Sequence, residues 1–139
     1  MKRAKGFTLV ELVIVIVIVG ILSIVAVPIY RGYTRKAMGT EAKSLLGSIQ
    51  TAQKVYYAEH AAFWNAAASG TDFSEALDVD ARSNKYFKKF SVTTVSDGSV
   101  PGFQASTTGD DATAAKGISM TLTAYQSGEP QWKDAGLNN

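Results

Sequence analysis

The feature that most constrains this chain is an uncharged run of 19 residues, from Leu12 to Tyr30, close to the N-terminus. Together with its flank, and interrupted only by Glu11, the apolar segment extends from Phe7 to Ile29 and has 23 residues. As an α-helix it reaches about 35 Å, which is enough to cross a hydrocarbon core of about 30 Å. Its valine and isoleucine content would favour a strand in water, but a single strand cannot satisfy its backbone hydrogen bonds in lipid. We therefore expect a membrane-spanning helix.

A cleaved secretory signal is the competing interpretation, because basic residues precede the apolar segment. Signal cores are usually about 7 to 15 residues long and end in a site of the A-x-A type. No such site follows this segment. Charge leaves the orientation open, because three basic residues lie on each side: Lys2, Arg3 and Lys5 before the segment, and Arg31, Arg35 and Lys36 after it.

The sequence after Tyr30 predicts that the helix continues with an amphipathic half. Apolar residues recur there at steps of three and four: Met38, Ala42, Leu45, Leu46, Ile49, Ala52 and Tyr56. The charged residues fall mostly outside this stripe: Arg35, Lys36, Glu41, Lys43 and Lys54. One helix is expected from near Phe7 to about Ala58, and its apolar stripe requires a partner.

The C-terminal part supplies that partner as an antiparallel sheet of about three to four strands. Residues 117–125 alternate between apolar and polar side chains, which is typical of a half-buried strand. Strands are also predicted at 90–95 and 103–108, with turn residues between them, and a short strand is expected around 131–133. The predicted fold class is α+β, a long N-terminal helix packed against a C-terminal antiparallel sheet.

The segment between helix and sheet has a weaker pattern. Residues 66–72 are rich in small and turn-forming residues and are predicted as a loop. Residues 72–77 are predicted as a short helix capped by Asp72 or Ser74.

The chain offers little for catalysis or metal binding. It has no cysteine and one histidine, His60, which excludes disulfides, thiolate zinc sites and histidine-based triads or metal clusters. His60 is expected to be solvated near the C-terminal end of the helix, where the dipole favours a cation. The segment from Asp78 begins like a calcium loop, but Arg82 and Lys89 stand at ligand positions and Ser83 replaces the turn glycine. We expect no catalytic residue, no cofactor and no metal.

One basic and aromatic cluster leaves nucleic acid open as a partner. In residues 85–90, Lys85, Lys88 and Lys89 alternate with Tyr86, Phe87 and Phe90. Such a cluster could contact DNA or an anionic surface. The interpretation we favour is a solvated strand edge whose charges discourage pairing with other chains.

Glu11 is the most unusual residue of the apolar segment, because an ionised carboxylate inside a membrane costs on the order of 3 kcal/mol. In the uncut chain it lies about one turn from the end of the span and could reach the headgroups. A cut between Gly6 and Phe7 would lower the basic residues from 14 to 11 against 12 acidic ones. It would also leave a charged α-amine on Phe7, four residues from Glu11. In an apolar environment both charges require pairing, either within one chain or between neighbouring helices, and the latter would also fix their stagger.

These residues resemble the N-terminus of type IV pilins and related filament proteins. The stretch "KGFTLVELVIVIVIVGILSIVAVP" has a glycine, then Phe-Thr-Leu-x-Glu, then a long Val, Ile and Leu run that ends in Pro28. The resemblance implies that a prepilin peptidase cuts between Gly6 and Phe7 and methylates the amine of Phe7. It also implies that Glu11 pairs with the N-terminus of a neighbouring subunit during assembly.

The resemblance further implies that the helix loosens between Gly20 and Pro28 in the filament. This fits the residues, because Pro28 has no N–H to donate to the carbonyl of Ile24 and Gly20 lowers helix propensity. One departure is the lack of cysteine, since many major pilins close a C-terminal loop with a disulfide.

Four parts of the chain follow from the resemblance. They are a leader (1–6), a transmembrane and filament-core helix (7–30), its amphipathic continuation (31–60) and a β domain with its connecting loop (61–139). The implied partners are copies of the chain in a homopolymer, the prepilin peptidase, the pilus assembly machinery and, before assembly, the bacterial inner membrane. The expected function is a structural subunit of an extracellular type IV pilus and not an enzyme. Two alternatives stay open: a pseudopilin or minor pilin of a secretion or DNA-uptake machine, and a membrane-anchored ectodomain that never polymerises.

Overall fold

The computed structural model describes residues 6–65 and 70–137. Within these residues one long helix, α1 (Leu9–His60), precedes six strands. The chain divides into two compact units, residues 1–34 and 35–139, so α1 begins in the first and ends in the second. The α+β class and the single long helix are thus confirmed. Most of the expected leader and residues 66–69 of the expected loop lie outside the described residues.

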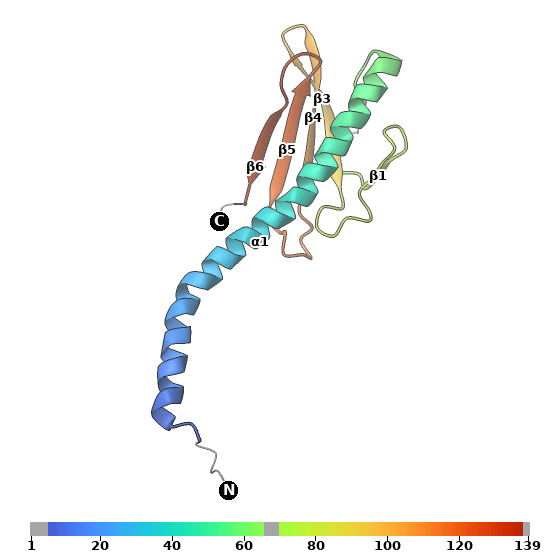
Figure 1. Cartoon of the computed structure of the whole chain (residues 1–139). Helices are drawn as coiled ribbons and strands as arrows, with labels where there is room; N and C mark the ends of the chain where they lie inside the picture. The colour runs from blue at the N-terminus through green and yellow to red at the C-terminus, as the bar shows by residue number, and fades with distance from the viewer. Residues whose placement is uncertain (1–5, 66–69, 138–139) are drawn as a thin grey trace. The chain divides into compact units, whose positions relative to one another are not determined.

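The first unit contains α1 as far as Thr34, and every residue from Gly6 to Tyr30 is exposed in the single chain. The helix continues through Pro28 without interruption (Figure 1). Two hydroxyls turn back onto the helix: Ser23 Oγ donates to the Val19 carbonyl at 2.7 Å, and Thr34 Oγ1 donates to the Tyr30 carbonyl at 2.9 Å. Such bonds satisfy polar groups without water, so this stretch of helix suits an apolar environment.

The second unit packs the last part of α1 against a four-stranded antiparallel sheet (Figure 1). Its strand order is β3 (Phe90–Asp97), β4 (Val100–Thr108), β5 (Ser119–Tyr125) and β6 (Gln131–Ala135). Buried and partly exposed residues alternate along β5, as expected for a half-buried strand. The short fourth strand is confirmed and is two residues longer than predicted.

The predicted turn between β3 and β4 was too long. The strands meet at a tight turn, in which Gly98 has a φ of +59°. Pro101 and Gly102 belong to β4 and not to the turn. Gly102 is required by packing, because a Cβ there would lie 2.5 Å from Cδ1 of Tyr125 and 2.7 Å from the Ala124 carbonyl oxygen. Gly102 therefore lies inside β4 because of close packing and not because it forms a turn.

The short helix predicted at 72–77 is wrong. Phe73 and Ser74 form β1 (Phe73–Ser74), which pairs antiparallel with β2 (Val79–Asp80) through the turn between them. Ser74 Oγ accepts a hydrogen bond from the Leu77 N–H at 3.2 Å, as a helix cap would. The left-handed backbone of Asp78, with φ of +51°, reverses the chain before a second helical turn can form.

The hydrophobic core lies between α1 and the sheet. The predicted stripe is confirmed, because Met38, Ala42, Leu45, Leu46 and Ile49 are buried and Ala52 and Tyr56 pack at its margin. The opposite side of the core comes mainly from the sheet and the segment before it: Phe87, Phe90, Val92, Phe103, Ala105, Ile118, Met120 and Leu122. The C-terminal half is therefore the partner that the stripe required.

Two polar side chains of α1 fix segments distant in sequence. Glu41 accepts three backbone N–H bonds, from Lys85 at 3.2 Å, Tyr86 at 2.6 Å and Phe87 at 2.8 Å. Gln53 is fully buried; its Nε2 donates to the Trp64 carbonyl at 2.8 Å, and its Oε1 accepts from the Trp64 N–H at 2.9 Å. Both side chains satisfy backbone groups that lie outside any strand ladder.

We expect Gln53→Ala to lower the free energy of unfolding by about 2 kcal/mol, because two backbone groups of Trp64 lose their partners and a gap remains. Chemical denaturation of the full chain in detergent micelles measures the change. Gln131→Ala removes an exposed amide and is the matched control, with an effect within about 0.5 kcal/mol. Equal effects of the two substitutions would contradict the role of Gln53.

Candidate assembly site

The candidate site is the start of α1, where Thr8 and Glu11 bond to each other. The Thr8 N–H donates to Glu11 Oε2 at 2.9 Å, and Thr8 Oγ1 donates to the same oxygen at 2.8 Å. In return, the Glu11 N–H donates to Thr8 Oγ1, with 3.3 Å between nitrogen and oxygen. This reciprocal pattern is a capping box, which satisfies N–H groups that the first turn of a helix leaves without partners.

Gly6 and Phe7 precede the capping box and are open to the solvent. Phe7 is 88% exposed, and a Cβ added to Gly6 would meet nothing within 4 Å. The predicted cleavage bond thus lies in described residues that do not belong to α1 and are not packed in the single chain. The structure places Phe7 next to the cap formed by Thr8 and Glu11.

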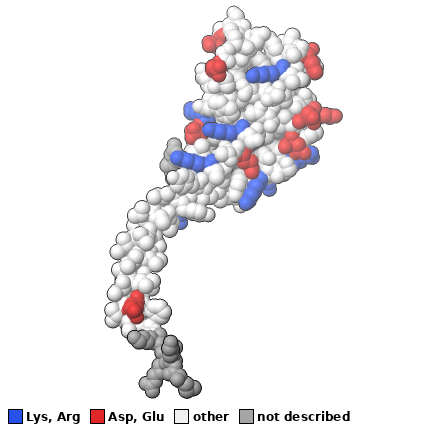
Figure 2. All heavy atoms as spheres, viewed as in Figure 1, with Lys and Arg blue, Asp and Glu red and all other residues white. Residues whose placement is uncertain are grey.

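The apolar surface that follows is continuous around the helix. Its large side chains are all exposed: Leu9, Val10, Leu12, Val13, Ile14, Val15, Ile16, Val17, Ile18, Val19, Ile21, Leu22, Ile24, Val25, Val27 and Ile29. In Figure 2 this stretch is an uncharged surface with one acidic group, as its sequence requires. A helix that is apolar on all sides is suited to lipid or to the interior of a helical bundle. Among the described residues, α1 is the one helix long and apolar enough to cross a membrane.

Gly20 and Pro28 lie in this apolar helix. A Cβ on Gly20 would meet nothing within 4 Å, so no contact of the single chain requires glycine there. Pro28 is inside α1 and leaves the carbonyl of Ile24 without its usual N–H donor. The predicted loosening of the helix concerns a filament and remains a prediction.

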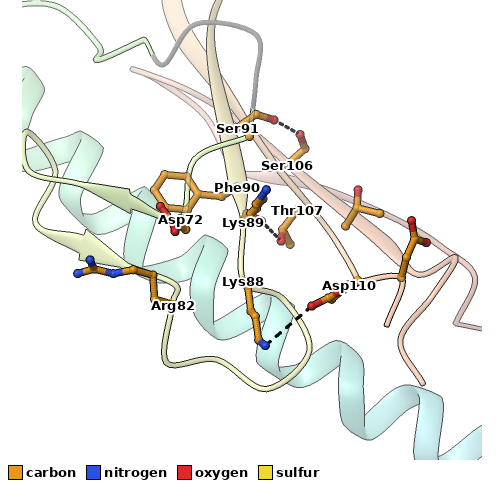
Figure 3. Close-up of a pocket in the computed structure, with 13 residues that line it drawn as sticks. Asp72, Arg82, Lys88, Lys89, Phe90, Ser91, Ser106, Thr107 and Asp110 are labelled. Carbon is orange, nitrogen blue, oxygen red and sulfur yellow. Dashed lines mark hydrogen bonds and ion pairs between the residues drawn. The ribbon is translucent and has the colours of Figure 1, made fainter. Parts of the chain in front are cut away.

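The second unit has a groove of about 690 Å³, which offers no catalytic set. Its lining includes three cations and three carboxylates: Arg82, Lys88 and Lys89, with Asp72, Asp110 and Asp111. Figure 3 shows Lys88 directed at Asp110, with Nζ 3.9 Å from Oδ2, and the hydroxyls of Ser91 and Ser106 in contact at 2.7 Å. The balanced charges do not favour a polyanion in this groove.

The fold buries two aromatic residues of the basic and aromatic cluster. Phe87 and Phe90 are buried in the core, and the ammonium group of Lys85 lies 4.9 Å from the ring centre of Tyr86. Phe90 begins β3, which is an edge strand of the sheet. The three lysines precede β3, and the edge of β3 at Phe90 is paired with Thr71, so the favoured interpretation of a charged strand edge is not confirmed.

In the segment that begins like a calcium loop, the carboxylate of an aspartate is bonded to an arginine of the same segment. Asp80 accepts bonds from Arg82 Nε at 2.9 Å and from Nη2 at 2.7 Å, and the Arg82 guanidinium lowers the pKa of Asp80 to about 2. No group of three or more His, Cys, Asp or Glu side chains that could hold a metal occurs in residues 6–65 and 70–137. His60 is exposed and stacks on Tyr56 with ring centres 4.1 Å apart.

Comparison with known proteins decides the family. Residues 1–27 match the prokaryotic N-terminal methylation motif. The chain is 34% identical over 128 residues to a fimbrial protein of Neisseria meningitidis serogroup A, which covers 92% of this chain and 71% of that relative. The chain belongs to the type IV pilin family. The resemblance found in the sequence is therefore confirmed.

Shorter matches have higher identity. The pilin is 52% identical over 56 residues to the type IV major pilin protein PilE of Neisseria gonorrhoeae and 48% identical over 52 residues to a fimbrial protein of Pseudomonas aeruginosa. These matches cover 40% and 37% of the pilin and about a third of each relative. Membership in this family implies a structural role for the chain.

Sequence reasoning missed Thr8 as a member of the site. The signal was available, because threonine followed three residues later by glutamate, just before an apolar run, is the pattern of a capping box. Glu11 was interpreted as a charge in lipid, and its hydrogen bonds to Thr8 were not predicted. The cap gives Glu11 a structural role, which experiments on assembly have to separate from the predicted charge pair.

Proposed function

We propose that this pilin is the structural subunit of a type IV pilus and polymerises through the apolar half of α1. The observation that carries the proposal is the apolar surface of α1, which is exposed on all sides from Leu12 to Tyr30. Exposure of apolar surface to water costs about 25 cal/mol per Å², so this surface is strongly unfavourable in water. It needs lipid before assembly and helices of other copies afterwards. The names of the relatives, fimbrial protein and type IV major pilin, favour a pilus over a pseudopilus.

The proposed assembly step depends on a cut between Gly6 and Phe7 by a prepilin peptidase, followed by methylation of the new amine. The amine of Phe7 then carries a positive charge that the uncut chain lacks at this place. Its partner is Glu11 of a neighbouring subunit, because each charge is costly in an apolar filament core when alone. Since Thr8 already holds Glu11 through hydrogen bonds, the carboxylate is oriented before the neighbour arrives.

The proposed path starts in the inner membrane and ends outside the cell. The pilus assembly machinery moves each subunit from lipid into the growing filament, and the apolar surface exchanges lipid for other helices. We also propose that α1 loosens between Gly20 and Pro28 on this transfer, because the Ile24 carbonyl has no intrahelical donor and Gly20 costs about 1 kcal/mol of helix propensity relative to alanine.

The test is the intact mass of the chain in filaments sheared from the cell surface. We expect a chain that begins at Phe7 and carries one added methyl group, because both changes precede assembly. A Gly6→Val variant provides the control and should leave the uncut chain in the membrane fraction. Uncut chains in sheared filaments would contradict the proposed processing, and a cleaved chain found only in the periplasm would support a pseudopilin instead.

A further inference from the structure

The end of the apolar segment opposite Glu11 carries exposed aromatic and basic side chains in one short stretch. Tyr30 is 73% exposed and Tyr33 is 70% exposed, and Arg31 between them is also exposed. At 3.6 residues per turn, the two tyrosines lie about 60° apart around the helix and Arg31 lies about 100° from Tyr30 on the other side. We call Tyr30, Arg31 and Tyr33 the collar; they lie within one turn of α1 and cover about 160° of its circumference.

The spacing between the collar and Glu11 matches the thickness of a membrane. From Glu11 to Arg31 the helix advances 20 residues, or about 30 Å, which equals the hydrocarbon thickness of a typical bilayer. The residues between them are uncharged. When Glu11 lies at one edge of the hydrocarbon, the collar therefore lies at the other edge. Tyrosine and arginine are suited to this level, because their apolar bodies lie along the acyl chains while their polar ends reach the headgroups.

The charge of the collar selects among headgroups. Arg31 is followed on the same helix by Lys36, which is also exposed. Arg35, by contrast, donates through Nη1 to the Gly136 carbonyl at 2.8 Å and is partly buried. No acidic side chain lies between Leu12 and Thr40 to offset these cations in the sequence. Anionic phospholipids attract such juxtamembrane cations, whereas zwitterionic lipids do so much less.

We propose that the collar binds the headgroups of anionic phospholipids and fixes the depth of the unassembled subunit in the bilayer. This inference rests on the membrane stage of the proposed function. The tyrosine hydroxyls donate to headgroup phosphates, and the guanidinium of Arg31 pairs with phosphate in the charge-assisted geometry typical of arginine. Entry into the filament then requires release of these lipids.

The test uses the full chain in nanodiscs that contain equal amounts of phosphatidylglycerol and phosphatidylcholine. Native mass spectrometry counts the adducts of each lipid that stay bound to the chain. Because Lys2, Arg3 and Lys5 also attract phosphatidylglycerol, the informative quantity is the change that a substitution causes. Arg31→Gln is expected to lower the ratio of phosphatidylglycerol to phosphatidylcholine adducts about fivefold. Arg31→Lys should retain most of the preference, since it keeps the charge.

Two further variants define the site. Replacement of both tyrosines by leucine should reduce retained adducts of both lipids, because the apolar body remains while the hydroxyls are lost. Lys54→Gln removes an exposed cation well beyond the collar and should leave the ratio unchanged. The proposal is overturned if Arg31→Gln leaves the ratio unchanged or if Lys54→Gln lowers it equally. Failure of the chain to enter nanodiscs would instead overturn the membrane stage itself, and with it the collar.

Discussion

Glu11→Gln is expected to reduce surface pili to below about one-hundredth of the normal amount while the chain remains in the membrane. In the proposed pairing, the substitution leaves the Phe7 amine of a neighbouring subunit without its counter-charge in an apolar core. Breaking a buried pair by removing one partner costs about 3–5 kcal/mol, which exceeds a hundredfold in the equilibrium for adding each subunit. The measurement is the ratio of sheared to cell-associated pilin by immunoblot, supported by electron microscopy of the cell surface.

Glutamine is the informative replacement because it separates the two roles of Glu11. Its side-chain oxygen can still accept from the Thr8 N–H, so the capping box is kept and only the charge is lost. Thr8→Val is the matched variant, because it removes the hydroxyl of the cap and keeps the charge of Glu11. Loss of a cap costs about 1 kcal/mol, so Thr8→Val should reduce pili far less.

The amounts of pili in the two variants distinguish three interpretations of the role of Glu11. Normal piliation of Glu11→Gln would show that the charge is dispensable and would contradict the proposed pairing. Near-normal pili in Glu11→Gln with a strong loss in Thr8→Val would indicate that Glu11 acts mainly as part of the helix cap. A strong loss in Glu11→Gln with near-normal pili in Thr8→Val supports a charge pair between subunits.

The long helix and the sheet could be predicted because their signals are periodic. The stripe from Met38 to Ile49 follows the period of a helix, and residues 118–124 follow the period of a strand. Both patterns arise because one side of the element is buried. The resulting period can be recognised within a short stretch of sequence. The segment around Phe73 has no such period, and a cap-like serine there supported the wrong element.

The hydrogen bonds by which Glu41 and Gln53 of α1 hold other segments could not be predicted, because the bonded residues lie outside the helix. Glu41 was placed among the charged residues that fall mostly outside the apolar stripe, and its bonds reach residues 44 to 46 positions later. Gln53 continues the stripe one turn beyond Ile49, but its polarity hid its burial. In both cases a side chain serves backbone groups whose location depends on the tertiary fold. Composition and periodicity carry no information about such pairs.

Glu41→Ala is expected to lower the free energy of unfolding of the second unit by about 3 kcal/mol, because three backbone N–H groups lose a charged acceptor. The lost bonds connect α1 to the chain just before β3, where Phe87 is fully buried against the core. For a unit of about 100 residues this corresponds to a fall in Tm of roughly 14 °C. Thermal unfolding of the full chain in detergent micelles, followed by circular dichroism, measures it.

Two variants separate the acceptor role of Glu41 from its charge and from the helix surface. Glu41→Gln keeps one oxygen as an acceptor without the charge, so its effect should lie between those of the original chain and Glu41→Ala. Glu59→Ala removes an exposed carboxylate from the same helix and should change stability by less than about 0.5 kcal/mol. If Glu41→Ala is no more harmful than Glu59→Ala, the three hydrogen bonds do not stabilise the unit. Because Glu41 lies beyond the apolar segment, its loss should destabilise the second unit while Glu11 and the capping box remain intact.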